Sequence, residues 1–268
     1  MRPTRRKRPK AAEAPFFVRL RRRSCFPELP TPMKLSIFDL DRTLLPIDSG
    51  DAWTYWLAER SGAARGELEA QFGRFVEDWN SGAFDALDFI HYQFGMLARH
   101  DRAELERWRS EFIDRVVRPA VRPEALALVA ERCAAGCRVI LATGTHRFVS
   151  EPIARLFGIE EVLAATPEER ADGSFTGRLV GSDSFGAGKV ALLRGWMRRT
   201  EARAGDVFEG IEWIEAWSDS AADLPLLEFA AGWRPAGGAV AVNPDPELGR
   251  IARTRGWRTL ELFKTEAG

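Results

Sequence analysis

Four aspartates of the sequence directly follow short apolar runs, and their carboxylates are the first candidates for chemistry. Two come after residues 34–38 and two after residues 211–217. If both runs are strands of one parallel sheet, the residues that follow them meet in the crevice at the carboxyl ends of the strands. Carboxylates so close together repel one another, which raises their pKa values unless a cation lies between them. Oxygen ligands favour Mg²⁺, so the sequence predicts a magnesium site at Asp39, Asp41, Asp219 and Asp223.

Groups that could bind a phosphoryl group stand at the same predicted edge. Thr143 and Gly144 follow a third apolar run, and Lys189 begins a helical pattern after a glycine-rich stretch. A cation, an ammonium group, a hydroxyl and exposed main-chain N–H groups together form a receptor for a phosphoryl group. Asp39, at a strand end, is the expected nucleophile, and Asp41 is the expected general acid and base. The expected reaction passes through an aspartyl phosphate that water hydrolyses.

The elements that must position these residues alternate along most of the chain. From residue 119 onward, apolar runs and amphipathic helices follow one another, which predicts parallel strands joined by helices. Residues 49–118 instead carry four helical patterns rich in aromatic residues. The sequence therefore predicts an α/β fold, a doubly wound Rossmann-like parallel sheet with an inserted all-helical cap. The expected strands lie at residues 34–38, 138–142, 161–165, 211–217 and 239–242, and a hairpin turns at residues 171–174.

The predicted division of the chain follows from this change of pattern. The core comprises residues 33–48 and 119–268, and the cap comprises residues 49–118. Residues 1–32 hold ten basic and two acidic residues, and because the whole chain has 39 of each sign, the remainder has eight more acids than bases. A polybasic arm could bind nucleic acid or an anionic membrane. We expect a disordered extension instead, and an acidic body that binds neither nucleic acid nor membrane.

The composition limits the class of protein. The chain has 268 residues, of which 45% are hydrophobic, and three cysteines that cannot all pair. This is enough apolar mass for a real core, which excludes a disordered or disulfide-stapled protein. No apolar run approaches the length of a membrane span. We therefore expect a soluble cytoplasmic protein.

The candidate residues resemble the motifs of the haloacid dehalogenase superfamily. Residues 38–44, Phe-Asp-Leu-Asp-Arg-Thr-Leu, resemble its first signature, and residues 218–223 resemble its acidic metal motif. By this resemblance, the catalytic residues are Asp39, Asp41, Thr143 and Lys189. The resemblance also implies that Mg²⁺ is held by the carboxylates of Asp39 and Asp219 and by the main-chain carbonyl of Asp41. Asp223 would support the metal site.

Within that superfamily, the sequence most resembles the phosphoserine phosphatase-like branch (HAD-IB). Its marks here are the cap directly after the first signature, residues 175–181 before the lysine, and residues 241–246 after the last expected strand. In that branch an acidic residue just past the first signature binds the substrate's ammonium group, and Asp48 occupies that place. Asp48 could equally cap the first cap helix. Thr43 and Gly144 complete the expected substrate-binding set.

These patterns together predict a Mg²⁺-dependent phosphomonoester hydrolase. The expected substrate is a small phosphorylated amino acid or amino alcohol, such as phosphoserine or histidinol phosphate. A phosphotransferase of the same fold, in which an acceptor hydroxyl replaces water, is an alternative. A non-catalytic phospho-acceptor module is a different class, and it needs neither Asp41 nor a cap. His146 follows the second expected strand and is a further candidate for substrate contact.

Overall fold

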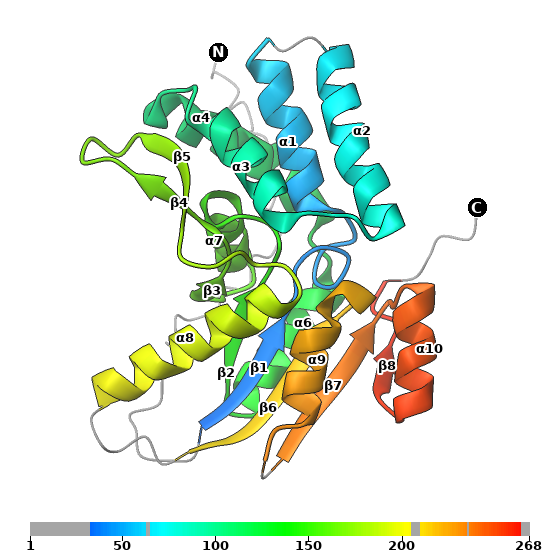
Figure 1. Ribbon diagram of the computed structural model, residues 1–268. Helices are drawn as coiled ribbons and strands as arrows, with labels where there is room; N and C mark the ends of the chain where they lie inside the picture. The colour runs from blue at the N-terminus through cyan, green and yellow to red at the C-terminus, as the bar shows by residue number, and fades with distance from the viewer. Residues whose placement is uncertain (1–32, 63–64, 205–209, 235, 264–268) are drawn as a thin grey trace, which may run out of the picture.

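The structure of the protein is a computed structural model that describes residues 33–62, 65–204, 210–234 and 236–263. Within these residues, six parallel strands form the central sheet (Figure 1). Their order is β3, β2, β1, β6, β7, β8, so the direction of winding reverses between β1 and β6. Neighbouring strands are parallel throughout this sheet. The bounds are β1 Met33–Phe38, β2 Cys137–Ala142, β3 Glu161–Leu163, β6 Ile211–Ser218, β7 Ala236–Val242 and β8 Arg258–Leu260. The predicted fold class is confirmed.

Helices cover both faces of the sheet, and β1 shows why. Leu35 and Ile37 are fully buried on one face, in a core shared with α8, α9 and α10. Phe38 is fully buried on the other face, in a core shared with α6 and α7. A strand that is apolar on both faces is stable only in a sheet covered on both sides. The covering helices are α6 Pro123–Ala134, α7 Arg147–Leu156, α8 Ala187–Ala204, α9 Leu224–Ala231 and α10 Pro246–Arg255.

Four helices follow β1 and lie beyond the carboxyl ends of the strands (Figure 1). They are α1 Ser49–Arg60, α2 Arg65–Ser81, α3 Ala86–Leu97 and α4 Arg102–Phe112. A π-helical turn, Ile113–Val117, and the short helix α5, Arg118–Ala120, lead back to the sheet. The buried ring of Trp53 meets the edges of Phe112 and Phe148 at centroid distances of 5.4 and 6.0 Å. Aromatic packing thus joins these helices to α7.

The predicted hairpin is present, and it packs against the helical segment. β4, Thr166–Glu169, and β5, Phe175–Val180, pair antiparallel, and β5 lies against α3. Arg102 of α4 donates a hydrogen bond of 2.8 Å to Glu169, and its guanidinium lies 4.6 Å from the ring centroid of Phe175. The division into core and cap stays a prediction. The hairpin, which follows residue 119, touches the helices assigned to the cap.

The sheet has one strand that the sequence did not predict. β8 has three residues, two of them exposed, and pairs with β7 at the edge of the sheet. A short exposed strand leaves no apolar run, and for this reason the pattern of the sequence could not indicate it.

Two further predictions concern the N-terminal extension and membrane-spanning helices. The predicted extension, residues 1–32, lies outside the described residues. None of the helices in the described part of the chain combines the length and apolar character that crossing a bilayer requires.

His146 is packed in the interior between α3 and α7. It is 1% exposed, and its ring meets Phe94 edge-on at 5.6 Å and stacks on Phe148 at 6.4 Å. Neither ring nitrogen has a hydrogen-bond partner among the described residues. Burial, with the nearby charge of Arg109, lowers the pKa of His146 to about 3. The residue is therefore a neutral core side chain, and nothing in its surroundings supports it as a candidate for substrate contact.

The substitution His146→Leu should remove part of the pH dependence of stability. The folded protein keeps the imidazole neutral down to its pKa of about 3, whereas the unfolded chain binds a proton near pH 6.5. The free energy of unfolding therefore falls as the pH drops from 6.5 toward 3, by up to about 1.4 kcal/mol per pH unit. Urea unfolding at about pH 7.5 and about pH 5 should show a fall that is smaller by about 2 kcal/mol in the variant.

His91→Gln is the matched control, because His91 is exposed on α3. This control should keep the pH dependence of the wild type. If His146→Leu kept it as well, the buried neutral imidazole would not be its source.

Candidate active site

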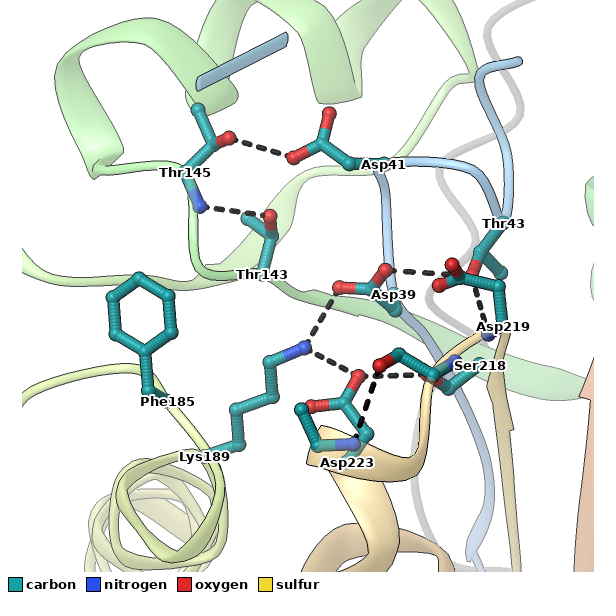
Figure 2. Close-up of polar contacts among 12 residues, drawn as sticks. Asp39, Asp41, Thr43, Thr143, Thr145, Phe185, Lys189, Ser218, Asp219 and Asp223 are labelled. Atoms are coloured by element: carbon teal, nitrogen blue, oxygen red, sulfur yellow. Dashed lines mark hydrogen bonds and ion pairs between the residues drawn. The ribbon is translucent and has the colours of Figure 1, made fainter. Parts of the chain in front are cut away.

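Polar residues from separate strands meet where the order of the sheet reverses (Figure 2). Asp39 follows β1, Thr143 follows β2, and Asp219 follows β6. Lys189 reaches them from the first turn of α8, and Asp223 from the short helical turn before α9. Open α/β sheets bind their ligands at this switch point, outside the carboxyl ends of the strands. The structure thus brings together the residues that the sequence singled out.

The ammonium group of Lys189 lies between two carboxylates. Its Nζ donates to Asp39 Oδ1 at 2.7 Å and to Asp223 Oδ2 at 2.6 Å, and Lys189 is 4% exposed. Ser218 Oγ donates to the same oxygen of Asp223 at 2.8 Å. Burial alone lowers the pKa of Lys189, but the charges of Asp223 and Asp39 outweigh it and raise the pKa above its ordinary value. Lys189 is therefore charged at neutral pH.

Asp39 and Asp219 lie on either side of the Thr43 hydroxyl. Thr43 Oγ1 is 3.3 Å from Asp39 Oδ2 and 3.1 Å from Asp219 Oδ1, and it accepts the main-chain N–H of Asp219 at 3.0 Å. Burial raises the pKa of Asp39 to about 6, although Lys189 opposes this. Burial, and then the charge of Asp39, raise the pKa of Asp219 to about 7. A cation between these two carboxylates would relieve their repulsion.

Asp41 projects away from this pair and is held by hydroxyl groups. Its Oδ1 accepts the main-chain N–H of Ser49 at 2.6 Å and the Ser49 hydroxyl at 2.5 Å. Its Oδ2 accepts the hydroxyl of Thr145 at 2.7 Å. Burial, then the charges of Asp48 and Asp39, raise the pKa of Asp41 well above its usual range. The carboxyl group is therefore protonated more readily than an exposed aspartate.

Ser49 and Thr145 are functional candidates that the sequence reading missed. Thr145 follows Thr143 by two residues at a strand end, and this was the available signal. The pattern could not show that Thr145 reaches a carboxylate 104 residues away. Gly50 leaves the necessary room, because a Cβ there would lie 2.8 Å from the Thr145 hydroxyl oxygen.

Asp48 caps α1, one of the two roles that the sequence left open. Its Oδ1 accepts the main-chain N–H of Asp51 at 2.9 Å, and its Oδ2 lies 3.6 Å from Arg42 Nη2. Asp51, on the first turn of α1, has its pKa raised to about 7 by burial and then by the charge of Asp48. Two carboxylates therefore stand side by side at the start of α1. The role of Asp48 in binding an ammonium group stays a prediction.

A cavity of about 370 Å³ opens above the buried carboxylates. Its polar lining includes Asp39, Asp41, Asp48, Asp51, Lys189, Asp219 and Asp223. Six aromatic side chains also line it, and we call four of them the aromatic wall: Trp79, Phe84, Phe89 and Phe185. Neighbouring rings of the wall lie between 5.0 and 6.4 Å apart, centroid to centroid. The cavity thus combines acidic and aromatic groups in its lining.

The remaining predicted residues differ in how they meet this cavity. Gly144 lines it, and a Cβ there would lie 2.9 Å from the ring of Phe185, so only glycine lets that ring pack so closely. Thr43 and Thr143 are fully buried beneath the surface of the cavity. Thr143 Oγ1 accepts the main-chain N–H of Thr145 at 3.1 Å and so orders the loop after β2.

The donor set at Asp39 and Asp219 suits a hard cation. Across the described residues, no three carboxylate, imidazole or thiolate groups converge in a metal-binding arrangement. The two carboxylates that flank Thr43 do face a common space, and main-chain carbonyl oxygens are accepted ligands of Mg²⁺. Asp223 lies beside that pair, and its Oδ2 accepts hydrogen bonds from Lys189 and Ser218. Hydrogen-bond donors therefore lie between the four carboxylates, and the metal-ligand roles of Asp41 and Asp223 stay predictions.

Comparisons with known proteins agree with this fold. The model of the haloacid dehalogenase-like hydrolase family matches residues 37–228. A histidinol-phosphatase of Neisseria meningitidis is 34% identical over 228 residues, which is 85% of this chain and 98% of that protein. A Bordetella pertussis protein of unknown function has a solved structure that is 35% identical, with a TM-score of 0.76, and covers 87% of this chain and 100% of that one.

A substrate-bound phosphoserine phosphatase shares the fold, with a TM-score of 0.57 at 17% identity over 87% of this chain and 94% of that one. The predicted enzyme class, a phosphatase, is confirmed by these comparisons together. The chain belongs to the haloacid dehalogenase-like hydrolase family.

The buried ion pairs of Lys189 yield a prediction about stability. Lys189→Met should lower the free energy of unfolding at neutral pH by about 3–5 kcal/mol, because it leaves two buried carboxylates without their cation. Adding Asp223→Asn should recover part of the loss, since one of those charges is then gone. Urea unfolding in the presence of a chelator measures both values. A single variant as stable as the wild type, or a double variant no better than the single one, would contradict the pairing.

Proposed function

We propose that the protein is a Mg²⁺-dependent phosphomonoester hydrolase that acts through an aspartyl phosphate on a small phosphorylated amino alcohol. The observation that carries the proposal is the buried contact of Asp39 with Lys189 at the switch point of the sheet, beside the cavity. The ammonium group holds the carboxylate in place, so that one oxygen can attack phosphorus without first being oriented.

The first step forms a bond between a carboxylate oxygen of Asp39 and phosphorus, while the bond from phosphorus to the alcohol oxygen breaks. Asp41 gives its proton to the departing oxygen, a role that its raised pKa supports. In the second step water attacks phosphorus and gives a proton to Asp41. The bond to Asp39 breaks, and inorganic phosphate leaves with both aspartates restored.

The phosphoryl group would be bound by residues around the nucleophile. Lys189 and the main-chain N–H groups at Gly144 would stabilise charge on its oxygens, and the buried Thr143 hydroxyl would take part from beneath by ordering that loop. Mg²⁺ would be held by the carboxylates of Asp39 and Asp219 and the carbonyl oxygen of Asp41, and when bound it would supply Lewis-acid stabilisation of the same charge. Thr43 supports the proposed metal site through its contacts with both carboxylates. Asp223 supports it indirectly, by holding Lys189.

The charges of the cavity support an amino alcohol in preference to an amino acid. Among the described residues that line it, the cationic side chains are Lys189 and Arg42, and both lie beside carboxylates. Phosphoserine would bring a carboxylate close to Asp48 and Asp51, whereas histidinol phosphate has an ammonium group and no carboxylate. The relative named as a histidinol-phosphatase supports the same choice.

Two alternatives differ from this proposal in their reactions. A phosphotransferase would use the same first step and then pass the phosphoryl group to an acceptor hydroxyl. A non-catalytic phospho-acceptor would stop at the phosphorylated aspartate, and it would have no use for Asp41 held by Ser49 and Thr145. The cytoplasmic location, and the expectation of no nucleic-acid or membrane partner, remain predictions.

Substitution of the two aspartates after β1 tests the chemistry. Asp39→Asn should abolish phosphate release, because the amide cannot form the covalent intermediate. Asp41→Asn should lower kcat at least about 10²-fold, the usual contribution of a general acid and base. Steady-state phosphate release from histidinol phosphate measures both. Asp114→Asn, at an exposed carboxylate, is the control and should keep wild-type rates. Unchanged turnover in Asp39→Asn would rule out covalent catalysis at this residue.

Asp219→Ala tests the proposed metal ligand. We expect its affinity for Mg²⁺ to fall more than about 10-fold, because the change removes a carboxylate ligand itself and not merely a neighbour of one. Isothermal titration with Mg²⁺ gives the affinity directly, and high Mg²⁺ should restore part of the activity. An affinity equal to that of the wild type would show that Asp219 does not bind the ion.

A further inference from the structure

Gln93 is a buried polar residue on α3 that the packing of that helix does not explain. Gln93 is 4% exposed. The residues within one turn of it on the same helix include four buried apolar residues, Phe89, Ile90, Phe94 and Leu97. The amide Nε2 donates to Thr54 Oγ1 at 3.1 Å. The amide oxygen Oε1 is buried and has no hydrogen-bond partner among the described residues.

The hydrogen bonds of Thr54 fix which way this amide points. The Thr54 hydroxyl donates its single proton to the main-chain oxygen of Gly50 at 2.9 Å. It can therefore only accept a hydrogen bond from Gln93, so the amide group that faces it must be the NH₂. Turning the amide over would set two acceptors against each other. The carbonyl oxygen of Gln93 is therefore the atom left without a donor.

The open space next to Gln93 is the cavity above the catalytic aspartates. Gln93 lines that cavity together with Gly50 and Asp51 of α1, and with Phe89 one turn earlier on its own helix. A buried carbonyl oxygen without a donor is unfavourable, and buried polar groups in native proteins nearly always find a partner. A donor on a molecule in the cavity would supply it.

We infer that Gln93 is a specificity-determining residue whose side-chain carbonyl oxygen accepts a hydrogen bond from a ring N–H of the substrate. This rests on the proposed function, since the ligand is the organic part of the phosphate ester. A ring donor fits because the flat faces of Phe89 and its neighbours in the aromatic wall favour packing against another planar ring. An imidazole ring carries such an N–H at its edge, and the face of the same ring can pack against the aromatic wall.

Asp51 complements this arrangement on the facing helix. It lies one residue after Gly50, whose carbonyl oxygen orders Thr54 and thereby Gln93. Its half-buried carboxylate lines the same cavity, and a substrate ammonium group would offset the cost of that partial burial. The cavity would then bind the ring and the ammonium group through separate residues, Gln93 for the first and Asp51 for the second.

Gln93→Met tests the inference, because methionine keeps the length of the side chain and removes the acceptor. We expect kcat/KM for histidinol phosphate to fall about 10- to 100-fold. Phenyl phosphate has a ring without N–H, and phosphoethanolamine has an ammonium group without a ring, so kcat/KM for both should change less than about twofold. The matched control is Gln71→Met, the same change at an exposed glutamine of α2, and it should leave all three substrates unaffected.

Binding of histidinol separates this inference from the proposed function. Histidinol has the ring and the ammonium group but no phosphate, so its affinity does not depend on phosphoryl transfer. Gln93→Met should bind it about 10-fold or more weakly than the wild type in isothermal titration. Urea unfolding of the same variant should show no net loss of stability, because removing the buried carbonyl oxygen that lacks a donor offsets the loss of the hydrogen bond to Thr54. Equal histidinol affinity in the two proteins, or an equal loss for phosphoethanolamine, would overturn the inference. A wild type that binds histidinol but releases no phosphate would instead refute the proposed function alone.

Discussion

The buried ammonium group of Lys189 imposes the constraint on which the rest of the site depends. It joins Asp39, at the end of β1, to Asp223, in the turn after β6, in a place almost closed to water. A charge in such a place is stable only when it is paired, so α8 and the ends of two strands are fixed relative to one another. The same arrangement leaves Asp39 and Asp219 facing each other across Thr43 with raised pKa values. The pairing that holds the site together thus also shapes the position that we propose for the divalent cation.

A second network connects this centre to the helices beyond the sheet. Asp41 accepts hydrogen bonds from Ser49, the first residue of α1, and from Thr145 in the loop after β2. The position of the proposed acid and base therefore depends on where α1 begins. From the same helix, Gly50 orders Thr54 and Gln93 above the cavity. Phosphoryl transfer is assigned to residues at the ends of the strands, and recognition of the organic group to residues of α1 and α3. The two functions meet within three consecutive residues, 49–51.

The sequence could predict the fold and the residues at the strand ends because both follow from local pattern. Apolar runs that stop abruptly at aspartate or threonine mark the carboxyl ends of buried parallel strands, and such ends must converge. Contacts between distant helices left no such mark. In the sequence, Gln93 is a single polar residue in an apolar helix. Only the structure shows that Thr54, 39 residues earlier, fixes the orientation of its amide group. Charge repulsion alone places Asp223 with the metal ligands, and only the structure shows that its Oδ2 accepts hydrogen bonds from Lys189 and Ser218. The exposed edge strand β8 left no apolar signal at all.

The central claim is that the carboxylate of Asp39 becomes phosphorylated during turnover. Rapid quenching of the wild type with substrate and Mg²⁺, followed by borohydride reduction and peptide mass spectrometry, reads this out directly, because reduction converts an aspartyl phosphate to homoserine. The account predicts homoserine at position 39 and at no other aspartate of the site. Reduction at Asp41 or Asp219 instead, or at none of them while phosphate is released, would contradict it.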